Sequence, residues 1–430
     1  MAVSLKFGTD GVRAEALTVL TTQYVAALAR AAAQVLGGGE WLIGRDTRES
    51  GPALEAAVAA GLAAAGAQPA SMGVVPTPAL AWLSAERGVP AAMITASHNP
   101  WQDNGVKFFA PGGQKLPDDV ERAIEALLQP ELPMPAEHVP AVRDGGAYAA
   151  HLTAVSGRLD GLRIVLDCAN GAMSAVAPAV FRSLGADVVV IHDTPDGRNI
   201  NDHCGATHTA SLAATVVAEG AALGLAFDGD GDRVIAIDHL GHVVDGDRLI
   251  ALAALQLRDE GALHHDTVVV TVMSNLGFHK AMADAGIEVA TTAVGDRYVL
   301  EALDAGGYSV GGEQSGHIIY RDLATTGDGL LAGLRLAEFV HNHGLTSGRS
   351  LADLAGEVMT SYPQVLVNVK VAERHPQVAD ELAAEIAAAE ARLQGDGRIL
   401  LRASGTPRSR TKCASRSPAS RPSPVVARSR

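Results

Sequence analysis

The feature that most constrains the fold is a strand–helix–strand pattern that occurs three times along the chain. The copies occupy residues 40–78, 162–191 and 266–294. In the second copy, for example, the apolar run LRIVLD precedes a helix-forming stretch, and the run VVVI follows it. Short β-branched runs that alternate with helices of about ten or more residues indicate βαβ units with parallel strands. The pattern therefore predicts an α/β fold with three similar α/β domains in tandem.

The pattern lapses at three places, which we interpret as domain limits. Residues 129–144 are rich in proline and acid, and further lapses fall near 241–250 and Tyr362. Beyond Tyr362, the strand-like run QVLVNVKVAE and a helical Ala/Glu segment over 376–394 predict a smaller α+β domain. We expect four domains, over residues 1–150, 151–248, 249–361 and 362–406.

The last 24 residues, 407–430, differ in kind from the rest of the chain. They contain Arg, Ser and Pro without any apolar period, a composition that predicts a disordered basic tail. Such a tail does not complete the domain in which GRILLRAS has just begun a strand, so we expect the fourth domain to be truncated. An altered, frameshifted C-terminus and a natural disordered tail both remain open.

Composition excludes several classes of protein. The formal net charge is −14, even though the tail adds seven basic residues and no acid, and nucleic-acid binders normally carry a basic surface. No apolar stretch is long enough for a membrane span, and the N-terminus has no apolar signal core. The three cysteines show no metal-binding spacing. We expect a cytoplasmic protein with reduced thiols and without nucleic-acid or membrane partners.

The first chemical motif is TASHNP, residues 95–100, directly after the strand-like run VPAAMI. A serine at a strand end that is followed by His, Asn and Pro lies in a loop. Ser97 could be a nucleophile or a phosphate carrier, and His98 could orient or polarise it. The alternative is that Ser97 merely begins a turn.

The second motif is DGDGDR, residues 228–233, after the apolar run AALGLAF. Glycines between the three carboxylates let the backbone fold tightly, so three oxygens can converge on one cation. All-oxygen ligation by a few side chains suits Mg²⁺. An EF-hand would need Gly at its sixth and Glu at its twelfth position, where this chain has Arg233 and Leu240. A solvated acidic turn is the remaining alternative.

Two further loops carry groups that suit a sugar phosphate. GGEQSGH, residues 311–317, presents Glu, Ser and His between glycines, which suits a ring with neighbouring hydroxyl or ammonium groups. RASGT, residues 402–406, follows the run RILL and offers a guanidinium, two hydroxyls and exposed backbone N–H groups for a phosphate. A plain turn is the alternative for each loop.

Isolated cations near these motifs are weaker candidates. Lys107 follows the serine loop and could act as a general acid or base if its surroundings lower its pKa, or it could be a surface lysine. Arg13 in FGTDGVR and the arginines of 44–48 and 295–297 supply further positive groups.

Taken in order, TASHNP, DGDGDR, GEQSGH and RASGT resemble the α-D-phosphohexomutase family, and the similarity runs from residue 5 to about residue 406. FGTDGVR and GEQSGH are most similar to the branch of the family that acts on glucosamine phosphates. The resemblance implies four domains around a central cleft: a phosphoserine domain, a metal-binding domain, a sugar-binding domain and a phosphate-binding domain. It also implies a homodimer.

The resemblance assigns a role to each motif. Ser97 is implied to be the phosphoserine, and Asp228, Asp230 and Asp232 to hold Mg²⁺ together with a phosphate oxygen on Ser97. His98, Lys107 and Arg13 are further candidate catalytic residues, chosen for their place near these motifs and not implied by the resemblance. The residues implied to contact the sugar and its non-reacting phosphate are Glu313, Ser315, His317, Arg402, Ser404, Gly405 and Thr406. Arg233, in the DGDGDR motif, is an additional candidate for substrate binding.

The implied reaction moves phosphate between the 6- and 1-positions of a hexosamine. Phospho-Ser97 gives its phosphoryl group to O1 of glucosamine 6-phosphate, and a hexosamine 1,6-bisphosphate, which also serves as primer, is the intermediate. Ser97 then takes back the phosphate from O6, and Lys107 is the candidate for moving the hydroxyl proton. Positioning and electrostatics are the main requirements of such a transfer.

One departure from the family bears on this expectation. The family continues after SGT with Glu-Pro and a strand that carries a further Arg, whereas here Thr406 is followed by Pro407 and Arg408. We expect weakened phosphate binding and a less stable fourth domain. Three alternatives stay open: a mutase for mannose or glucose phosphates, a sugar-phosphate-binding fold without turnover, and a Mg²⁺-dependent phosphatase that uses Ser97.

Overall fold

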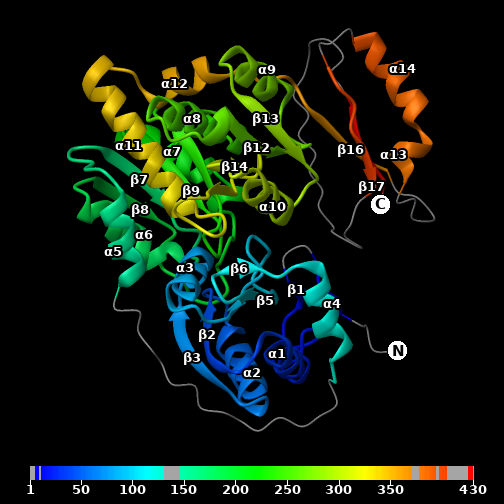
Figure 1. Ribbon diagram of the computed structural model, residues 1–430. Helices are drawn as coiled ribbons and strands as arrows, with labels where there is room; N and C mark the ends of the chain where they lie inside the picture. The colour runs from blue at the N-terminus through cyan, green and yellow to red at the C-terminus, as the bar shows by residue number, and fades with distance from the viewer. Residues whose placement is uncertain are drawn as a thin grey trace.

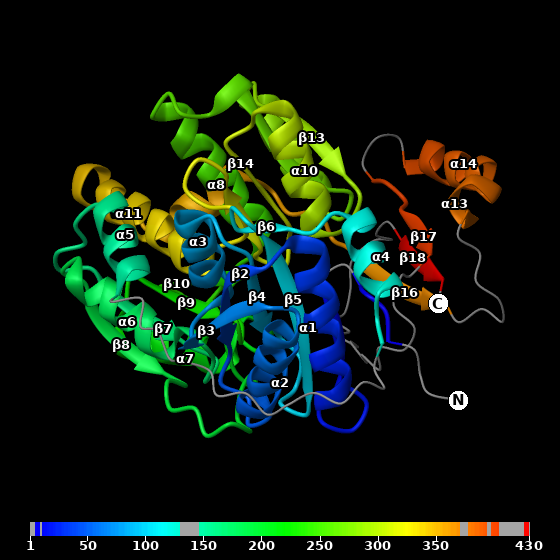
Figure 2. The same ribbon diagram turned by 60° about the horizontal axis from the view of Figure 1, so that its bottom comes forward.

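The computed structural model describes residues 5–8, 11–129, 146–369, 377–393, 397–403 and 425–429. Figure 1 shows four successive parts of the chain, and the first three lie against one another. The fourth, which carries the orange and red elements, stands to one side, and Figure 2 shows it in the same peripheral position after rotation.

The first domain is built on one mixed sheet flanked by four helices. Its strands are ordered β1-β5-β4-β2-β3, and β6 pairs with β5. The strands are β1 (Val12–Glu15), β2 (Gly39–Arg45), β3 (Ala67–Val74), β4 (Ala91–Ile94), β5 (Asp103–Ala110) and β6 (Gln114–Lys115). The helices are α1 (Thr22–Leu36), α2 (Gly51–Ala64), α3 (Thr77–Arg87) and α4 (Asp118–Ala126). Small residues let α1 and α2 approach closely, since a Cβ at Gly61 would lie 2.0 Å from the carbonyl oxygen of Ala26.

The second domain has five strands in the order β11-β10-β9-β7-β8. The strands are β7 (Arg163–Asp167), β8 (Asp187–Ile191), β9 (Leu223–Phe227), β10 (Val234–Asp238) and β11 (Val243–Val244). The helices are α5 (Ala147–Val155), α6 (Met173–Ser183) and α7 (Ala210–Glu219). Every residue of β9 and β10 is buried, which agrees with their apolar sequences LGLAF and VIAID.

The third domain has four strands in the order β13-β12-β14-β15. The strands are β12 (Thr267–Thr271), β13 (Glu288–Thr292), β14 (Val310–Gly312) and β15 (Ile318–Tyr320). The helices are α8 (Gly246–Asp259), α9 (Leu276–Asp284), α10 (Asp296–Gly306), α11 (Gly329–Ser347) and α12 (Leu351–Val358). Because α11 also packs on β9 and β10, one continuous apolar core joins the second and third domains.

The three predicted βαβ units are confirmed. They are β2–α2–β3, β7–α6–β8 and β12–α9–β13, and the two strands of each unit pair in parallel. The complete sheets are mixed, because β5, β10 and β15 return antiparallel to their neighbours. The expected limits at 150 and 248 fall inside α5 and α8, so we propose that the second and third domains begin at the starts of these helices.

The fourth domain contains β16 (Val365–Val369), α13 (Val378–Glu381), α14 (Ala383–Leu393), β17 (Leu401–Ala403) and β18 (Val425–Ser429). Strand β18 lies between β16 and β17 and pairs in parallel with both. The expectation of disorder was therefore wrong for residues 425–429. Their Val-Val pair has high strand propensity, and two strand edges are present to pair with it. Residues 407–424 and 430 lie outside the described part of the chain.

Candidate active site

Ser97 lies just beyond the carboxyl end of β4, and its hydroxyl reaches into the second domain. The residue is fully buried and has a left-handed backbone, with φ of 50°. Its N–H donates to Thr95 Oγ1 at 2.8 Å, and its Oγ donates to Asp228 Oδ2 at 2.6 Å. The serine of the first motif and the acids of the second therefore meet, although 131 positions separate them in the sequence.

Asp228, Asp230 and Asp232 form a buried cluster in the loop between β9 and β10. Each is at most 2% exposed, and one oxygen of each lies within 4.8 Å of the others. Gly231, with φ of 75°, allows the tight turn that brings them together. Asp232 Oδ1 is buried and accepts no hydrogen bond, and the guanidinium Nε of Arg233 lies 3.8 Å away. Three converging carboxylates with a spare oxygen fit a hard divalent cation such as Mg²⁺.

The ionised form of Asp228 is disfavoured in this cluster. Burial, followed by the charges of Asp232 and Asp230, raises the pKa of Asp228 well above its usual range. Arg233 and the hydrogen bond from Ser97 act in the opposite direction. A bound cation would offset both the burial and the mutual repulsion of the carboxylates.

Besides Ser97, two groups from the first domain contact the acids. Lys107 on β5 is 5% exposed, and its Nζ donates to Asp230 Oδ2 at 2.9 Å and to Asp232 Oδ2 at 3.4 Å. Thr77 Oγ1, at the start of α3, donates to Asp230 Oδ2 at 2.6 Å. Lys107 is therefore a site residue and not a surface lysine. Sequence analysis missed Thr77, whose only signal is the segment VVPTPA between a strand and a helix.

His98 and Arg233 border the serine. His98 Nδ1 lies 3.3 Å from Ser97 Oγ and 3.4 Å from Arg233 Nη1. The backbone N–H of Arg233 donates to Asp228 Oδ1 at 3.2 Å. The imidazole thus lies beside the serine hydroxyl and the guanidinium beside the imidazole, and their contact with a phosphoryl group stays a prediction.

Arg13 lies on β1, opposite Gly105 of β5. A Cβ at Gly105 would come within 2.6 Å of the Thr95 carbonyl oxygen and 2.8 Å of Arg13 Cγ. The arginine stem therefore packs beside the strand end that leads to Ser97. A catalytic role for Arg13 stays a prediction.

The GEQSGH loop joins β14 to β15 and is hydrogen-bonded to the end of the loop that carries the three acids, hereafter the acid loop. Val234 N donates to Gly316 O at 3.0 Å, immediately after the DGDGDR motif. Glu313 Oε1 accepts a hydrogen bond from Gly295 N at 3.1 Å, and Ser315 is exposed. His317 is 2% exposed, with Nε2 3.4 Å from Asp296 Oδ2. The sugar-binding roles of Glu313, Ser315 and His317 stay predictions.

Of the four residues proposed to bind the phosphate, only the backbone of Arg402 lies in the described part of the structure. Arg402 lies on β17, where it pairs in register with Arg428 of β18, but its side chain is outside the described part of the structure. Ser404, Gly405 and Thr406 also lie outside the described residues. Their contact with a phosphate therefore stays a prediction.

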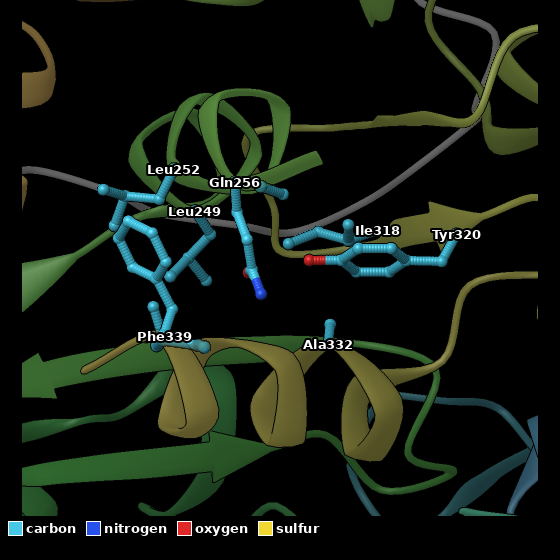
Figure 3. A pocket seen from close by; sticks show the side chains of 9 residues that line it. Leu249, Leu252, Gln256, Ile318, Tyr320, Ala332 and Phe339 are labelled. Atoms are coloured by element: carbon cyan, nitrogen blue, oxygen red, sulfur yellow. The ribbon is translucent and has the colours of Figure 1, made fainter. Parts of the chain in front are cut away.

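The pocket in Figure 3 is separate from these groups. Gln256 and Leu249 reach into it from α8, the Tyr320 ring borders it, and Ala332 and Phe339 face it from α11. Its walls are mainly apolar and carry no member of the acidic cluster. We interpret it as a packing gap between α8 and α11.

Comparison with known protein families shows to which family the chain belongs. Models of the phosphoglucomutase/phosphomannomutase family match all four parts: α/β/α domain I at residues 4–132, domain II at 146–241, domain III at 245–362 and the C-terminal domain at 366–407. The chain belongs to the phosphoglucomutase/phosphomannomutase family. As a member of this mutase family it is an isomerase, and its three α/β domains with a smaller C-terminal domain confirm the fold expected from the sequence.

Individual members of the family are similar over most of their length. A phosphoglucosamine mutase from Frankia casuarinae is 53% identical over 422 residues, which cover 93% of this chain and 91% of the relative. One from Rhodococcus opacus is 51% identical over 416 residues, covering 93% and 92%. The crystal structure of a putative phosphomannomutase from Thermus thermophilus has a TM-score of 0.76 at 27% identity, covering 83% of this chain and 84% of that one. None of the described helices combines the length and hydropathy that a membrane crossing requires.

Proposed function

We propose that this mutase interconverts glucosamine 6-phosphate and glucosamine 1-phosphate, and that Ser97 carries the phosphoryl group in transit. The observation that carries the proposal is the 2.6 Å contact between Ser97 Oγ and Asp228 Oδ2 within the three-carboxylate cluster. The choice of glucosamine phosphates is supported by the relatives of 53% and 51% identity that are named phosphoglucosamine mutases.

The reaction requires two transfers that mirror each other. In the first, the bond from phosphorus to Ser97 Oγ breaks while a bond forms to O1 of glucosamine 6-phosphate. The O1 proton passes to a base, for which Lys107 as a neutral amine is the candidate, and this base then gives the proton to Ser97 Oγ. The bisphosphate then turns over, and Ser97 Oγ takes the phosphoryl group from O6. Exclusion of water from the closed site would protect the phosphoserine from hydrolysis during these steps.

The surrounding residues stabilise the charge of the transferring group. A Mg²⁺ ion held by Asp228, Asp230 and Asp232 would neutralise charge on the phosphoryl oxygens. His98 lies 3.3 Å from Ser97 Oγ and Arg233 lies 3.4 Å from His98, so both are candidates to donate hydrogen bonds to the same group.

The remaining roles concern the substrate's other end and are proposals of the same kind. We assign the sugar hydroxyls to Glu313 and Ser315, with His317 as their neighbour, and an additional phosphate contact to Arg13. The proposed cradle for the non-reacting phosphate is formed by Arg402, Ser404, Gly405 and Thr406.

We also propose a cytoplasmic homodimer primed by hexosamine 1,6-bisphosphate. Cys168 and Cys204, both in the described part of the chain, are free and buried, as a reducing compartment favours. Light scattering coupled to size-exclusion chromatography measures the oligomeric state directly, and a monomer at micromolar concentration would contradict the dimer.

The test is a coupled assay with glucosamine 6-phosphate, Mg²⁺ and a catalytic amount of the bisphosphate. We expect turnover that falls by more than about 10³-fold in Ser97→Ala, because the phosphate carrier is gone. The matched control is Ser84→Ala, which removes an equally buried serine of α3. Folded wild-type protein that shows no isomerisation would overturn the proposal.

The same assay separates the alternatives. Higher kcat/KM with mannose or glucose phosphates would move the substrate to a hexose. Stoichiometric release of inorganic phosphate would identify a phosphatase. Binding in calorimetry without any turnover would identify an inactive mutase fold.

A further inference from the structure

We propose that Asn201 and Arg48 are positioning residues that clamp the backbone of Ser97 and so aim its hydroxyl at Asp228. Asn201 belongs to the second domain and Arg48 to the first, so the clamp closes across the boundary between them. The inference rests on the proposed function, because the clamped serine is the phosphate carrier of that reaction.

The backbone of Ser97 needs such support. A non-glycine residue with φ of 50° is strained by about 1 kcal/mol or more, and it persists only where its surroundings determine it. The carbonyl oxygen of Ser97 accepts two hydrogen bonds, from Arg48 Nη2 at 2.9 Å and from Asn201 Nδ2 at 2.8 Å. Arg48 is 1% and Asn201 8% exposed, so water competes little for either contact.

Arg48 acts as a template for the whole serine loop. Its Nη2 also donates to Asn99 O at 2.9 Å, and its Nη1 donates to Pro100 O at 2.5 Å and Asp103 O at 3.0 Å. Its Nε pairs with Asp46 Oδ2 at 2.9 Å, and neither side chain is exposed. A planar, buried guanidinium that donates to four carbonyl oxygens of this loop restrains the loop strongly.

Asn201 connects this loop to the second domain. Its Nδ2 also donates to Asn99 O at 3.1 Å, and its own φ of 57° is one that asparagine tolerates well. Gly229 of the acid loop completes the contact, since a Cβ there would lie 2.6 Å from Ser97 O and 2.8 Å from Asn201 Nδ2. The acid loop therefore rests directly on the clamp.

A buried carboxylate fixes the segment that carries Asn201. Asp167, at the end of β7, accepts hydrogen bonds from Ala169 N and Gly205 N, both at 2.9 Å, and Ala169 O accepts one from Asn201 N at 2.9 Å. His192 and Cys204 lie beside Asp167. Because both Asp167 oxygens already accept backbone hydrogen bonds, we assign this group to support of the clamp. The segments LDCANGA, residues 166–172, and NINDHCGATH, residues 199–208, thereby acquire a role.

The clamp predicts a specific kinetic effect. Asn201 contacts the backbone of the serine loop and not the sugar-binding loop, so its loss should move Ser97 Oγ without removing a proposed substrate contact. A displacement of about 1 Å at a reacting atom can cost on the order of 10²-fold in rate. We expect kcat to fall while KM stays nearly constant.

Two variants test the clamp, and both tolerate the left-handed backbone. Asn201→Gly removes the amide donor, and Asn201→Asp keeps its shape but places a carboxylate oxygen against two carbonyl oxygens. The matched control is Asn199→Ala on the same loop, whose side chain contacts Thr194 and Asp196 but not the serine loop. We expect kcat to fall by about 10- to 100-fold in both Asn201 variants, with KM within threefold of wild type and the control unchanged.

A second measurement separates positioning from loss of stability. Phosphorylation of Ser97 by the bisphosphate is followed by intact mass spectrometry, at a temperature where circular dichroism shows each variant to be folded. Slower phosphorylation of folded Asn201→Asp supports the clamp. Wild-type kcat and phosphorylation rates in both folded variants would overturn it. A wild-type protein without mutase activity would instead refute the proposed function, so the two failures are distinguishable.

Discussion

Strands β12 and β16 are both rich in valine, yet they are packed in very different ways. All five residues of β12 are buried, whereas Val365, Val367 and Val369 of β16 are 43%, 39% and 46% exposed. Apolar side chains of α9 and α10 join the cores around β12, but α13 and α14 contain no buried residue. Strand propensity is thus alike in β12 and β16, but helices cover β12 whereas the three described valines of β16 remain exposed.

This difference decides where charge can be buried. The first three domains, hereafter the body, hold Asp228, Asp247 and Asp328 almost fully buried, and burial is the main cause that raises the pKa of each carboxyl. Keeping such groups inside costs free energy that a large core can offset. Among the described residues of the fourth domain, none belongs to an apolar core, so we expect buried acids in the body and not there.

The largest expected effect comes from removing one carboxylate of the buried acidic cluster in the first three domains. Asp228→Asn should lower kcat by about 10²- to 10⁴-fold, because the divalent cation and Ser97 lose a ligand and a partner. In EDTA the same change should raise the Tm by a few degrees, since it removes one of three repelling carboxylates. Differential scanning fluorimetry with and without Mg²⁺ measures both states. A lower Tm in EDTA would show that the cluster stabilises the body even without a cation.

The next effect concerns pH. Burial raises the pKa of Asp328 to about 6, although Leu331 N and Tyr148 OH donate to the carboxyl and lower it. Between pH 4 and 6 the folded state therefore keeps a proton that the unfolded state has lost, so stability falls as pH rises, by roughly 3 kcal/mol or less. Asp328→Asn should flatten this slope and still cap α11.

Urea unfolding of wild type and Asp328→Asn at pH 4, 5 and 6 measures the slope. The control is Asp353→Asn, which changes an exposed carboxyl whose pKa is lowered by hydrogen bonds from Ser350. Parallel stability profiles for wild type and Asp328→Asn would show that Asp328 is not the source of the slope.

A smaller effect compares the two strands directly. Val269→Ala in β12 should reduce the free energy of unfolding by roughly 2 kcal/mol, because its side chain is 0% exposed. Val367→Ala in β16 should change it by less than about 0.5 kcal/mol. Equal losses in chemical denaturation would mean that β16 is covered in solution, and the contrast between the two regions would fail.

The smallest effect concerns the C-terminus. Replacing residues 407–430 with a family-like end, beginning Glu-Pro and containing a strand with an arginine, should lower KM about tenfold by completing the phosphate site. The free energy of unfolding of the first three domains should not change, because the apolar cores of these domains contain no residue of the fourth. An unchanged KM would show that the present tail, in which β18 already pairs with β17, serves the substrate equally well.

The sequence by itself determined the three βαβ units, the serine at the end of β4 and the acids after β9. These features depend on local periodicity and on glycine placement within a few residues, so they can be predicted from the sequence alone. The meeting of Ser97 with Asp228 was expected only through family resemblance. Sequence analysis did not predict strand β18, because this strand is stabilised by pairing with β16 and β17, which are distant in the sequence.

Only the tertiary structure decided which residues surround the serine. Thr77 and Asp230 are separated by 153 positions, and Asn201 and Ser97 by 104. No local pattern marks such a pair, because a hydrogen bond between domains depends on how two separately folded units pack. The chemical groups were therefore evident from the sequence, whereas their positioning depends on contacts that form only when the first and second domains come together.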